Sequence, residues 1–276
     1  MGKVIAVCTS DRKGIQKKDV GTAHFSAEWG IDGDAHAGKW HRQISLLSAD
    51  KIDAFNKRGA NVIPGAFGEN LVVEGFDFRA LPVGTLLRCN DVLLEMTQIG
   101  KECHSHCEIY KKMGDCIMPR EGVFARVLEP GTISVGDEMT IVPREGHFPW
   151  QAAVITLSDK GAAGERKDES GPAIAKRLRE AGYEVVEEVL IPDDARVLKQ
   201  QLIRLCDQRQ LDLILTTGGT GSAAQEAIRA AADKAAPSIT ASAVRGKTLI
   251  IGSPEERMDA LMDSAPQVME SLRNGR

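Results

Sequence analysis

The sequence lacks the features that would place the protein in a membrane, on nucleic acid or outside the cell. No apolar run approaches the roughly 20 residues that a membrane span needs. The formal net charge is -4, so there is no strong basic field of the kind that binds nucleic acid. The opening MGKVIAVCTS is too short an apolar run for a signal peptide and has no cleavage pattern. We therefore expect a cytoplasmic protein that binds neither membranes nor nucleic acid.

Aromatic residues are also scarce, at 4% of 276 residues, whereas hydrophobic residues make up 42% and charged residues 27%. This composition is typical of a soluble globular protein, and the length suits two domains of ordinary size. Disulfides are rare in the reducing cytoplasm, so we expect the 6 cysteines to be thiols, ligands or nucleophiles. Cys8, Cys89 and Cys206 lie in apolar patterns and are predicted to be buried.

The two halves of the sequence have different patterns, and each half is predicted to form a domain. Short apolar alternations punctuated by glycine predict a β-rich barrel over residues 1–143, with one helix at SADKIDAFNKRG. Residues 144–151 contain glycine and proline and are predicted to be a linker. Over residues 152–276, strands alternate with amphipathic helices, which predicts an α/β domain with a mostly parallel sheet. Pro266 is expected to kink or interrupt the last helix.

Polar residues follow the ends of three predicted strands in the second half. Because ligands bind beyond the carboxyl ends of parallel strands, we expect these residues to line one polar cleft. The glycine turn TTGGTG would let backbone N–H groups approach an anion, and the alternative is a tight turn without a ligand. Ser170 is also predicted to cap a helix. The predicted ligand-binding residues are Ser158, Asp168, Ser170, Gly218, Gly219, Thr220 and Gly221, with Asp193 and Asp194 at the same edge.

Together, SDKGAAGERKDESGP, IPDD and LILTTGGTG resemble the MogA/MoaB-type molybdopterin-binding domain. The resemblance implies molybdopterin binding and, in enzymatic members, adenylylation with ATP and Mg²⁺. It also implies a catalytic role for Asp193, which matches the aspartate of the family's PD motif. After Gly221 the sequence departs from the family, because the acidic residue of the next motif has no counterpart and the region looks shortened. We therefore expect molybdopterin binding, and adenylyltransferase activity is in doubt.

Charged residues also lie between glycines in the segment GIDGDAHAGKWHRQISLLS. His36, Lys39 and Arg42 suit a phosphate or a molybdate-like oxyanion. Arg126, on a predicted strand of the same barrel, is expected to join them. The alternative is a solvated loop with ordinary surface arginines.

Cysteine and histidine are concentrated in QIGKECHSHCEIYKKMGDC, and three interpretations are open. Nearby positive charge would lower the pKa of the Cys103 thiol and make it reactive, with Cys107 and Cys116 as resolving thiols. Alternatively, Cys103, Cys107, Cys116 and His106 would bind Zn²⁺, although their spacing is not a common zinc pattern. The third interpretation is a set of unreactive thiols.

The segments GDAHAG, RQISLLS, GAFGENL, TQIGKEC and VFARVLEPGTISVGDE resemble the MOSC domain along nearly all of residues 3–142. The resemblance implies a β-rich barrel that delivers sulfur or binds the molybdenum cofactor, with Cys103 at the position of the proposed reactive cysteine. It also implies a sulfur donor and a molybdoenzyme acceptor as partners.

The two halves point to one pathway, so we predict a molybdenum-cofactor maturation protein. The barrel would handle sulfur or the metal-bearing cofactor through Cys103, in a sulfurtransferase-like reaction, and the second domain would bind molybdopterin. The alternatives are a non-catalytic carrier of molybdopterin or molybdenum cofactor, and a zinc-stabilised scaffold. The choice between molybdenum and tungsten and the oligomeric state are left open by the sequence.

Overall fold

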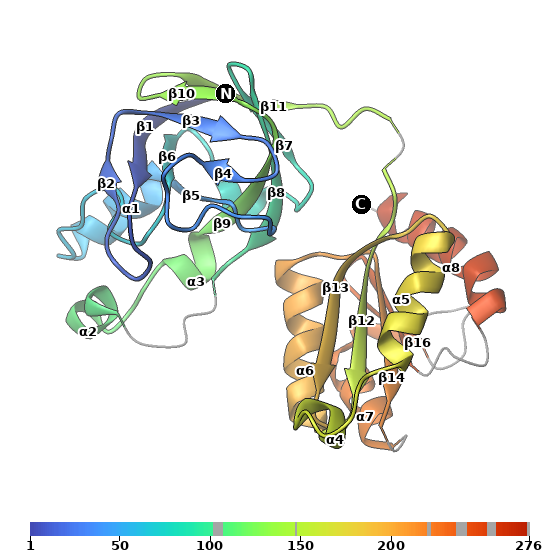
Figure 1. The fold of residues 1–276 in the computed structure, drawn as a ribbon. Coiled ribbons are helices and arrows are strands. Elements are labelled where there is room, and N and C mark those ends of the chain that lie inside the picture. The colour runs from blue at the N-terminus through green and yellow to red at the C-terminus, as the bar shows by residue number, and fades with distance from the viewer. Residues whose placement is uncertain (102–106, 147, 220–221, 236–241, 253–257, 275–276) are drawn as a thin grey trace. The chain divides into compact units, whose positions relative to one another are not determined.

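The chain forms two compact units, residues 1–145 and residues 146–276, which are coloured from blue to green and from yellow to red in Figure 1. Among the residues that the structure describes, no helix is both long and apolar enough to cross a membrane. The structure is a computed structural model, and it describes residues 1–101, 107–146, 148–219, 222–235, 242–252 and 258–274.

Strands of the first unit close into a barrel, which confirms the predicted fold class of this half. All neighbours around the ring are antiparallel except β5 and β6, which are parallel. The interior is one apolar cluster that includes Leu46, Leu87 and Met96, each fully buried. Within the described residues the ring order is β1 (Gly2–Thr9), β11 (Glu138–Val142), β7 (Leu86–Cys89), β8 (Val92–Ile99), β9 (Val123–Glu129), β5 (Ile44–Ser48) and β6 (Leu71–Glu74), which pairs back to β1.

Short elements decorate the barrel. Helix α1 (Ala49–Lys57) is the helix that the sequence predicted, and it buries Ile52 and Phe55. The other short elements were not predicted, because segments of two to six residues carry too little periodicity to be recognised. They are β2 (Lys18–Asp19), β3 (Thr22–Ser26), β4 (Gly30–Ile31), the 3-10 turn η1 (Phe78–Ala80), α2 (Glu108–Met113), α3 (Met118–Glu121) and β10 (Gly131–Ser134).

The second unit is a sheet covered by helices on both faces, as its alternating pattern predicted. The first four strands in the sheet order are parallel, and β16 and β15 add an antiparallel edge that the sequence did not predict. The sheet order is β13 (Glu184–Ile191), β12 (Gln151–Leu157), β14 (Leu213–Gly218), β17 (Thr248–Gly252), β16 (Ser242–Arg245) and β15 (Lys234–Ala235).

Two apolar clusters attach the helices to the two faces of this sheet. One cluster contains residues of α5 (Ser170–Glu180) and α8 (Met258–Asn274), and the other contains residues of α6 (Ala195–Ile203) and α7 (Ser222–Ala231). The short helix α4 (Asp159–Ala162) follows β12, and a π-helical turn (η2, Arg204–Gln208) extends α6. In the view of Figure 1, α5 and α6 stand on either side of β12.

Two helix predictions need correction. Helix α8 runs through Pro266 without interruption, and Leu261, Ala265 and Met269 pack against the sheet on both sides of the proline. The alternative expectation, a kink at Pro266, stays a prediction. Ser170 is the first residue of α5 and does not cap it. The cap comes instead from Asp168, whose Oδ1 accepts a hydrogen bond from the backbone N–H of Gly171 at 3.1 Å.

Candidate functional sites

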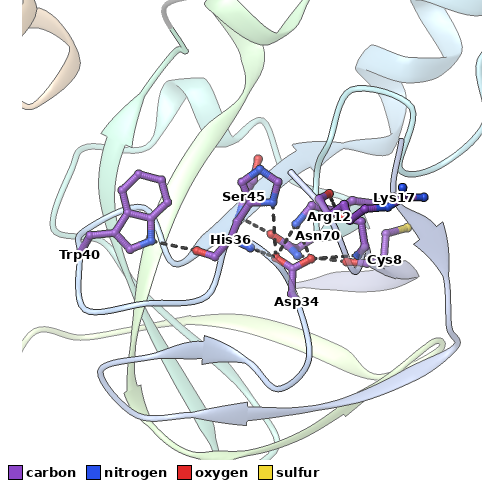
Figure 2. Close-up of polar contacts among 9 residues, drawn as sticks. Cys8, Arg12, Lys17, Asp34, His36, Trp40, Ser45 and Asn70 are labelled. Carbon is purple, nitrogen blue, oxygen red and sulfur yellow. Dashed lines mark hydrogen bonds and ion pairs between the residues drawn. The ribbon is translucent and has the colours of Figure 1, made fainter. Parts of the chain in front are cut away.

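A buried ion pair lies beneath the loop that carries GDAHAG. Lys17 Nζ donates to Asp34 Oδ1 at 2.9 Å and to Asp34 Oδ2 at 2.7 Å (Figure 2). The carboxylate also accepts from the backbone N–H groups of Ser10, at 3.0 Å, and His36, at 3.2 Å. Burial opposes the charge of Asp34, but the hydrogen bond and charge of Lys17 and the two N–H donors lower its pKa. Lys17 was not predicted from the sequence, where it resembles any exposed lysine of a charged loop.

The GAFGENL segment holds Lys17 in place. The backbone N–H of Lys17 donates to the carbonyl of Gly65 at 3.0 Å. Gly65 has a φ of +87°, and a Cβ atom there would lie 2.3 Å from the Lys17 carbonyl oxygen, so this position requires glycine. Glu69 is fully buried and accepts from the N–H groups of Gly65, at 2.7 Å, and Phe67, at 3.0 Å. Burial raises the pKa of Glu69 to about 7.

Asn70, the next residue of that segment, ties two barrel strands together. Its side chain donates to the Cys8 carbonyl of β1 at 3.0 Å and accepts from the backbone N–H of Ser45 on β5 at 3.1 Å (Figure 2). These bonds anchor the strand from which the Lys17 loop departs. The motif therefore acts as a scaffold for the buried ion pair.

His36, one of the predicted anion ligands, lies at the edge of this pair. Its Nδ1 atom is 3.8 Å from Asp34 Oδ2, and its side chain is 31% exposed. Burial lowers the pKa of His36, and the positive charges of Lys17, Lys101 and Lys13 lower it further. Lys101 precedes Cys103 by two residues, so the strand end that leads to the predicted reactive cysteine lies close enough to affect this histidine.

The remaining predicted anion ligands have other surroundings. Lys39 is exposed. The Arg42 guanidinium lies over the Trp40 ring, 4.8 Å from its centroid, and over the Phe124 ring, at 5.4 Å. Arg126 donates from Nε to the buried Glu95 at 2.6 Å, across the β8–β9 pair. An anion-binding role for Lys39, Arg42 and Arg126 remains a prediction.

The predicted reactive and metal-binding residues Cys103 and His106 lie outside the described residues. The Cys107 thiol is exposed and Cys116 is buried. In the part of the chain that the structure describes, no group of three or more His, Cys, Asp or Glu side chains could hold a metal ion. Cys8, Cys89 and Cys206 are buried as predicted, and burial raises the pKa of each thiol to about 12.

In the second unit, the predicted polar residues gather at the carboxyl edge of the parallel strands. Ser158 follows β12 and accepts from the N–H of Gly161 at 3.0 Å. Asp159 Oδ1 accepts from the N–H of Asp193, which follows β13, at 2.9 Å. Asp194 caps α6 by accepting from backbone N–H groups of its first turn, and these bonds lower its pKa. The Asp194 side chain is therefore used as the cap of α6, whereas Asp193 lies beside Gly219, just after the end of β14.

The glycine turn after β14 lies against Asp193. Gly219 has a φ of +75°, and a Cβ atom there would lie 2.8 Å from Asp193 Oδ1. A similar corner exists at Gly171, where a Cβ atom would lie 2.4 Å from Thr156 Oγ1 and 2.6 Å from Asp168 Oδ2. Neither position therefore has room for a Cβ atom beside these side chains, so both require glycine. Thr220 and Gly221 lie outside the described residues.

Two threonines near these glycines, Thr156 and Thr217, were not predicted from the sequence. Thr156 and Thr217 are paired in the parallel register of β12 and β14 and are 5% and 1% exposed. The Thr217 hydroxyl is buried and makes no hydrogen bond with any residue that the structure describes. An unsatisfied buried hydroxyl is costly, and a bound ligand at the strand ends would relieve that cost.

Comparison with protein families identifies both units. Residues 33–140 match the MOSC domain, and residues 153–254 match a family described as a probable molybdopterin binding domain. The molybdopterin adenylyltransferase of Pyrococcus furiosus is 41% identical over 80 residues, which are 28% of this chain and 45% of that protein. The chain thus spans less than half the length of this curated relative.

Two solved structures are similar to this chain over part of its length. MoaB from Thermus thermophilus, described as a molybdopterin biosynthesis enzyme, is 32% identical, with a TM-score of 0.41 over 46% of this chain and 98% of that chain. YiiM from Geobacillus stearothermophilus is 15% identical, with a TM-score of 0.42 over 84% of this chain and 100% of that chain.

Proposed function

We propose, from the premise that this chain joins a MOSC domain to a molybdopterin-binding domain, that it acts in the maturation of the molybdenum cofactor. In this proposal the second unit binds molybdopterin at the carboxyl edge of its sheet. The MOSC barrel handles sulfur or the metal-bearing cofactor through Cys103. The curated relatives share only part of their length with this chain, so the activity is inferred from the sites themselves.

The observation that carries the proposal for the second unit is the meeting of Asp193, Gly219 and Thr217 at one sheet edge. Glycine N–H groups suit the phosphate of molybdopterin, and the Thr217 hydroxyl, which bonds to none of the described residues, offers a further hydrogen bond. Asp193 is a carboxylate of the kind that Mg²⁺ prefers, so it would hold Mg²⁺ beside that phosphate. The proposal does not extend to adenylyl transfer, because the acidic residue expected after Gly221 has no counterpart.

In the barrel, the cations around His36 support the handling of an anionic sulfur or oxyanion group. Lys101 belongs to this set and precedes Cys103 by two residues. A nearby cation stabilises a thiolate, which is the nucleophilic form of cysteine. The Cys103 thiolate would attack the terminal sulfur of a donor persulfide, form a new S–S bond and release the donor as its thiolate. A thiolate of an acceptor such as a molybdoenzyme would then attack the outer sulfur of the Cys103 persulfide, form a new S–S bond and release Cys103 as its thiolate.

Mass spectrometry of the intact, natively purified protein tests the role of Cys103. We expect an adduct with the mass of one sulfur atom that disappears in Cys103→Ala and persists in Cys89→Ala, a control thiol buried in the barrel. Metal analysis of the same samples tests the alternative scaffold. If the protein carries no sulfur adduct but holds stoichiometric zinc that is lost in Cys103→Ala, the cysteine cluster is a structural metal site and the proposed sulfur transfer is wrong.

Pterin analysis of the purified protein tests the second unit. Bound molybdopterin, released as a fluorescent oxidised pterin, should fall in Asp193→Asn and remain in Asp194→Asn, which keeps an oxygen that can cap the helix. Bound pterin without a sulfur adduct or zinc would identify the protein as a cofactor carrier. Absence of pterin from a folded protein that has been incubated with it would refute the proposal for this unit.

A further inference from the structure

The Lys17–Asp34 pair is buried in a way that packing alone does not require. Each side chain is 1% exposed, and removing two charges from water costs several kcal/mol per ion before their attraction is counted. Apolar residues of similar volume would serve packing at least as well. The pair therefore calls for a role beyond stability, and its contacts indicate which residue it serves.

The contacts of Asp34 lead outward to His36. Asp34 Oδ2, which receives the Lys17 ammonium at 2.7 Å, also accepts from the backbone N–H of His36 at 3.2 Å. The same oxygen faces the His36 ring, at 3.8 Å from Nδ1. The carboxylate thus holds the backbone of His36 by a hydrogen bond and lies beside its ring, while Lys17 holds the carboxylate in place.

The His36 ring presents different edges to the interior and to solvent. Nδ1 is buried and makes no hydrogen bond with any described residue, whereas the side chain as a whole is 31% exposed. The exposed part of the ring therefore lies away from Nδ1. A carboxylate that faces Nδ1 favours the tautomer with the proton on that atom, which leaves the lone pair on Nε2.

We infer that Lys17 is a positioning residue that acts through Asp34 to hold the His36 imidazole as the proton acceptor of the barrel site. The inference rests on the proposed function for the chemistry that it serves. The Nε2 lone pair of His36 takes the proton of a thiol or another acidic group, whose bonding electrons stay behind as the anion. The imidazolium formed in this way lies beside the Asp34 carboxylate, which stabilises its charge.

Charges around His36 keep it in the acceptor form. Lys17, Lys13 and Lys101 oppose protonation, Asp34 favours it, and burial opposes it most strongly. These groups come from the loop after β1, from the His36 loop itself and from the end of β8. The result is a lowered pKa, so the ring is neutral near pH 7 and able to accept a proton.

The test is ¹⁵N NMR of the histidine rings in the full-length protein over a range of pH. It is carried out in the Cys103→Ala background, so it does not depend on sulfur chemistry. The signal of His36 is assigned from its absence in His36→Gln. We expect a neutral ring at pH 7 with the proton on Nδ1.

Three variants separate positioning from scaffolding. Lys17→Met with Asp34→Asn removes both buried charges, so neither is left unpaired, and should abolish the preference for Nδ1–H. Lys17→Met alone, where it folds, should raise the pKa of His36, because a positive neighbour is lost while Asp34 remains. Lys13→Met is the matched control: Lys13 is exposed and does not bond to Asp34, so the tautomer should not change.

A proton on Nε2 of the unaltered protein, or an unchanged tautomer in the double variant, would overturn the inference. This result is independent of the proposed function. A correct tautomer without a persulfide on Cys103 would refute sulfur transfer alone. A persulfide on Cys103 with the wrong tautomer would refute the role of Lys17 alone.

Discussion

Lys17 Nζ lies 2.7 Å from Asp34 Oδ2, and both side chains are 1% exposed. The pair is formed by two loops, one after β1 and one after β4, that the barrel brings together. Its interior position makes each charge dependent on the other, because neither can be solvated alone. The same pair connects the core to His36, the half-buried histidine of the GDAHAG segment.

Lys17→Met is expected to lower the free energy of unfolding of the barrel by about 3–5 kcal/mol, since it leaves Asp34 buried without a partner. Combining it with Asp34→Asn should recover a large part of this loss. Urea unfolding followed by the fluorescence of Trp29 and Trp40 would measure both changes. Lys39→Met, at an exposed position of the neighbouring loop, should change stability by no more than about 0.5 kcal/mol. Equal losses in the single and double variants would contradict this account.

Glu69 should make the barrel less stable as the pH rises. Its pKa is raised from 4.5 to about 7, so between these values the folded state holds a proton that the unfolded state has released. The free energy of unfolding therefore falls as pH rises through this window, by up to roughly 3 kcal/mol. Glu69→Gln should remove that slope. The free energy of unfolding of both proteins should be measured from pH 5 to pH 8. If both depend on pH in the same way, Glu69 is not the source of the slope.

Gly219→Ala is expected to weaken molybdopterin binding about tenfold, a loss of roughly 1.4 kcal/mol. A Cβ atom at this position would lie 2.8 Å from Asp193 Oδ1 and push the carboxylate away from the turn. Gly182→Ala is a matched control, because Gly182 also has a positive φ, of +85°, but nothing lies within 4 Å of its added Cβ. Titration of both variants with molybdopterin would compare them. Equal weakening would show that backbone strain, and not the Asp193 contact, is responsible.

Thr217→Val should separate folding from binding at the sheet edge. The Thr217 hydroxyl is buried and unsatisfied by the described residues, so a valine of the same shape should leave stability within about 1 kcal/mol of the original or raise it. Molybdopterin affinity should nevertheless fall, because the ligand loses a hydrogen-bond partner. Thr217→Ser keeps the hydroxyl and should keep most of the affinity. Thermal unfolding and pterin binding measured on the same samples would decide the matter, and unimpaired binding in Thr217→Val would remove Thr217 from the site.

Local patterns in the sequence were enough to predict the architecture. The short apolar runs of β5 and β8, bounded by turns, and the helical spacing of Ile174 and Leu178 depend only on near neighbours, so they can be recognised without the fold. The glycine turn at Gly218 was recognised for the same reason, because a strand that runs into glycines at a sheet edge is a local signal.

Contacts between distant residues could not be predicted. Lys17 and Asp34 are separated by 17 positions, and Asn70 bonds to Cys8 across 62 positions. Nothing in the local sequence distinguishes Lys17 from the neighbouring lysines; its burial depends on the loop of Gly65 closing over it. Such pairings exist only once the barrel has closed.

The sequence by itself determined that the chain has a β-rich half and an α/β half, and that polar residues follow the strand ends of the second, because periodicity and turn chemistry are local properties. Only the tertiary structure decided which of these residues meet. It set Thr217 opposite Thr156 through strand register, and it assigned Asp194 to a helix cap while Asp193 faces the glycine turn. It also buried Lys17 with Asp34, because a charge can be removed from water only where the fold supplies its partner.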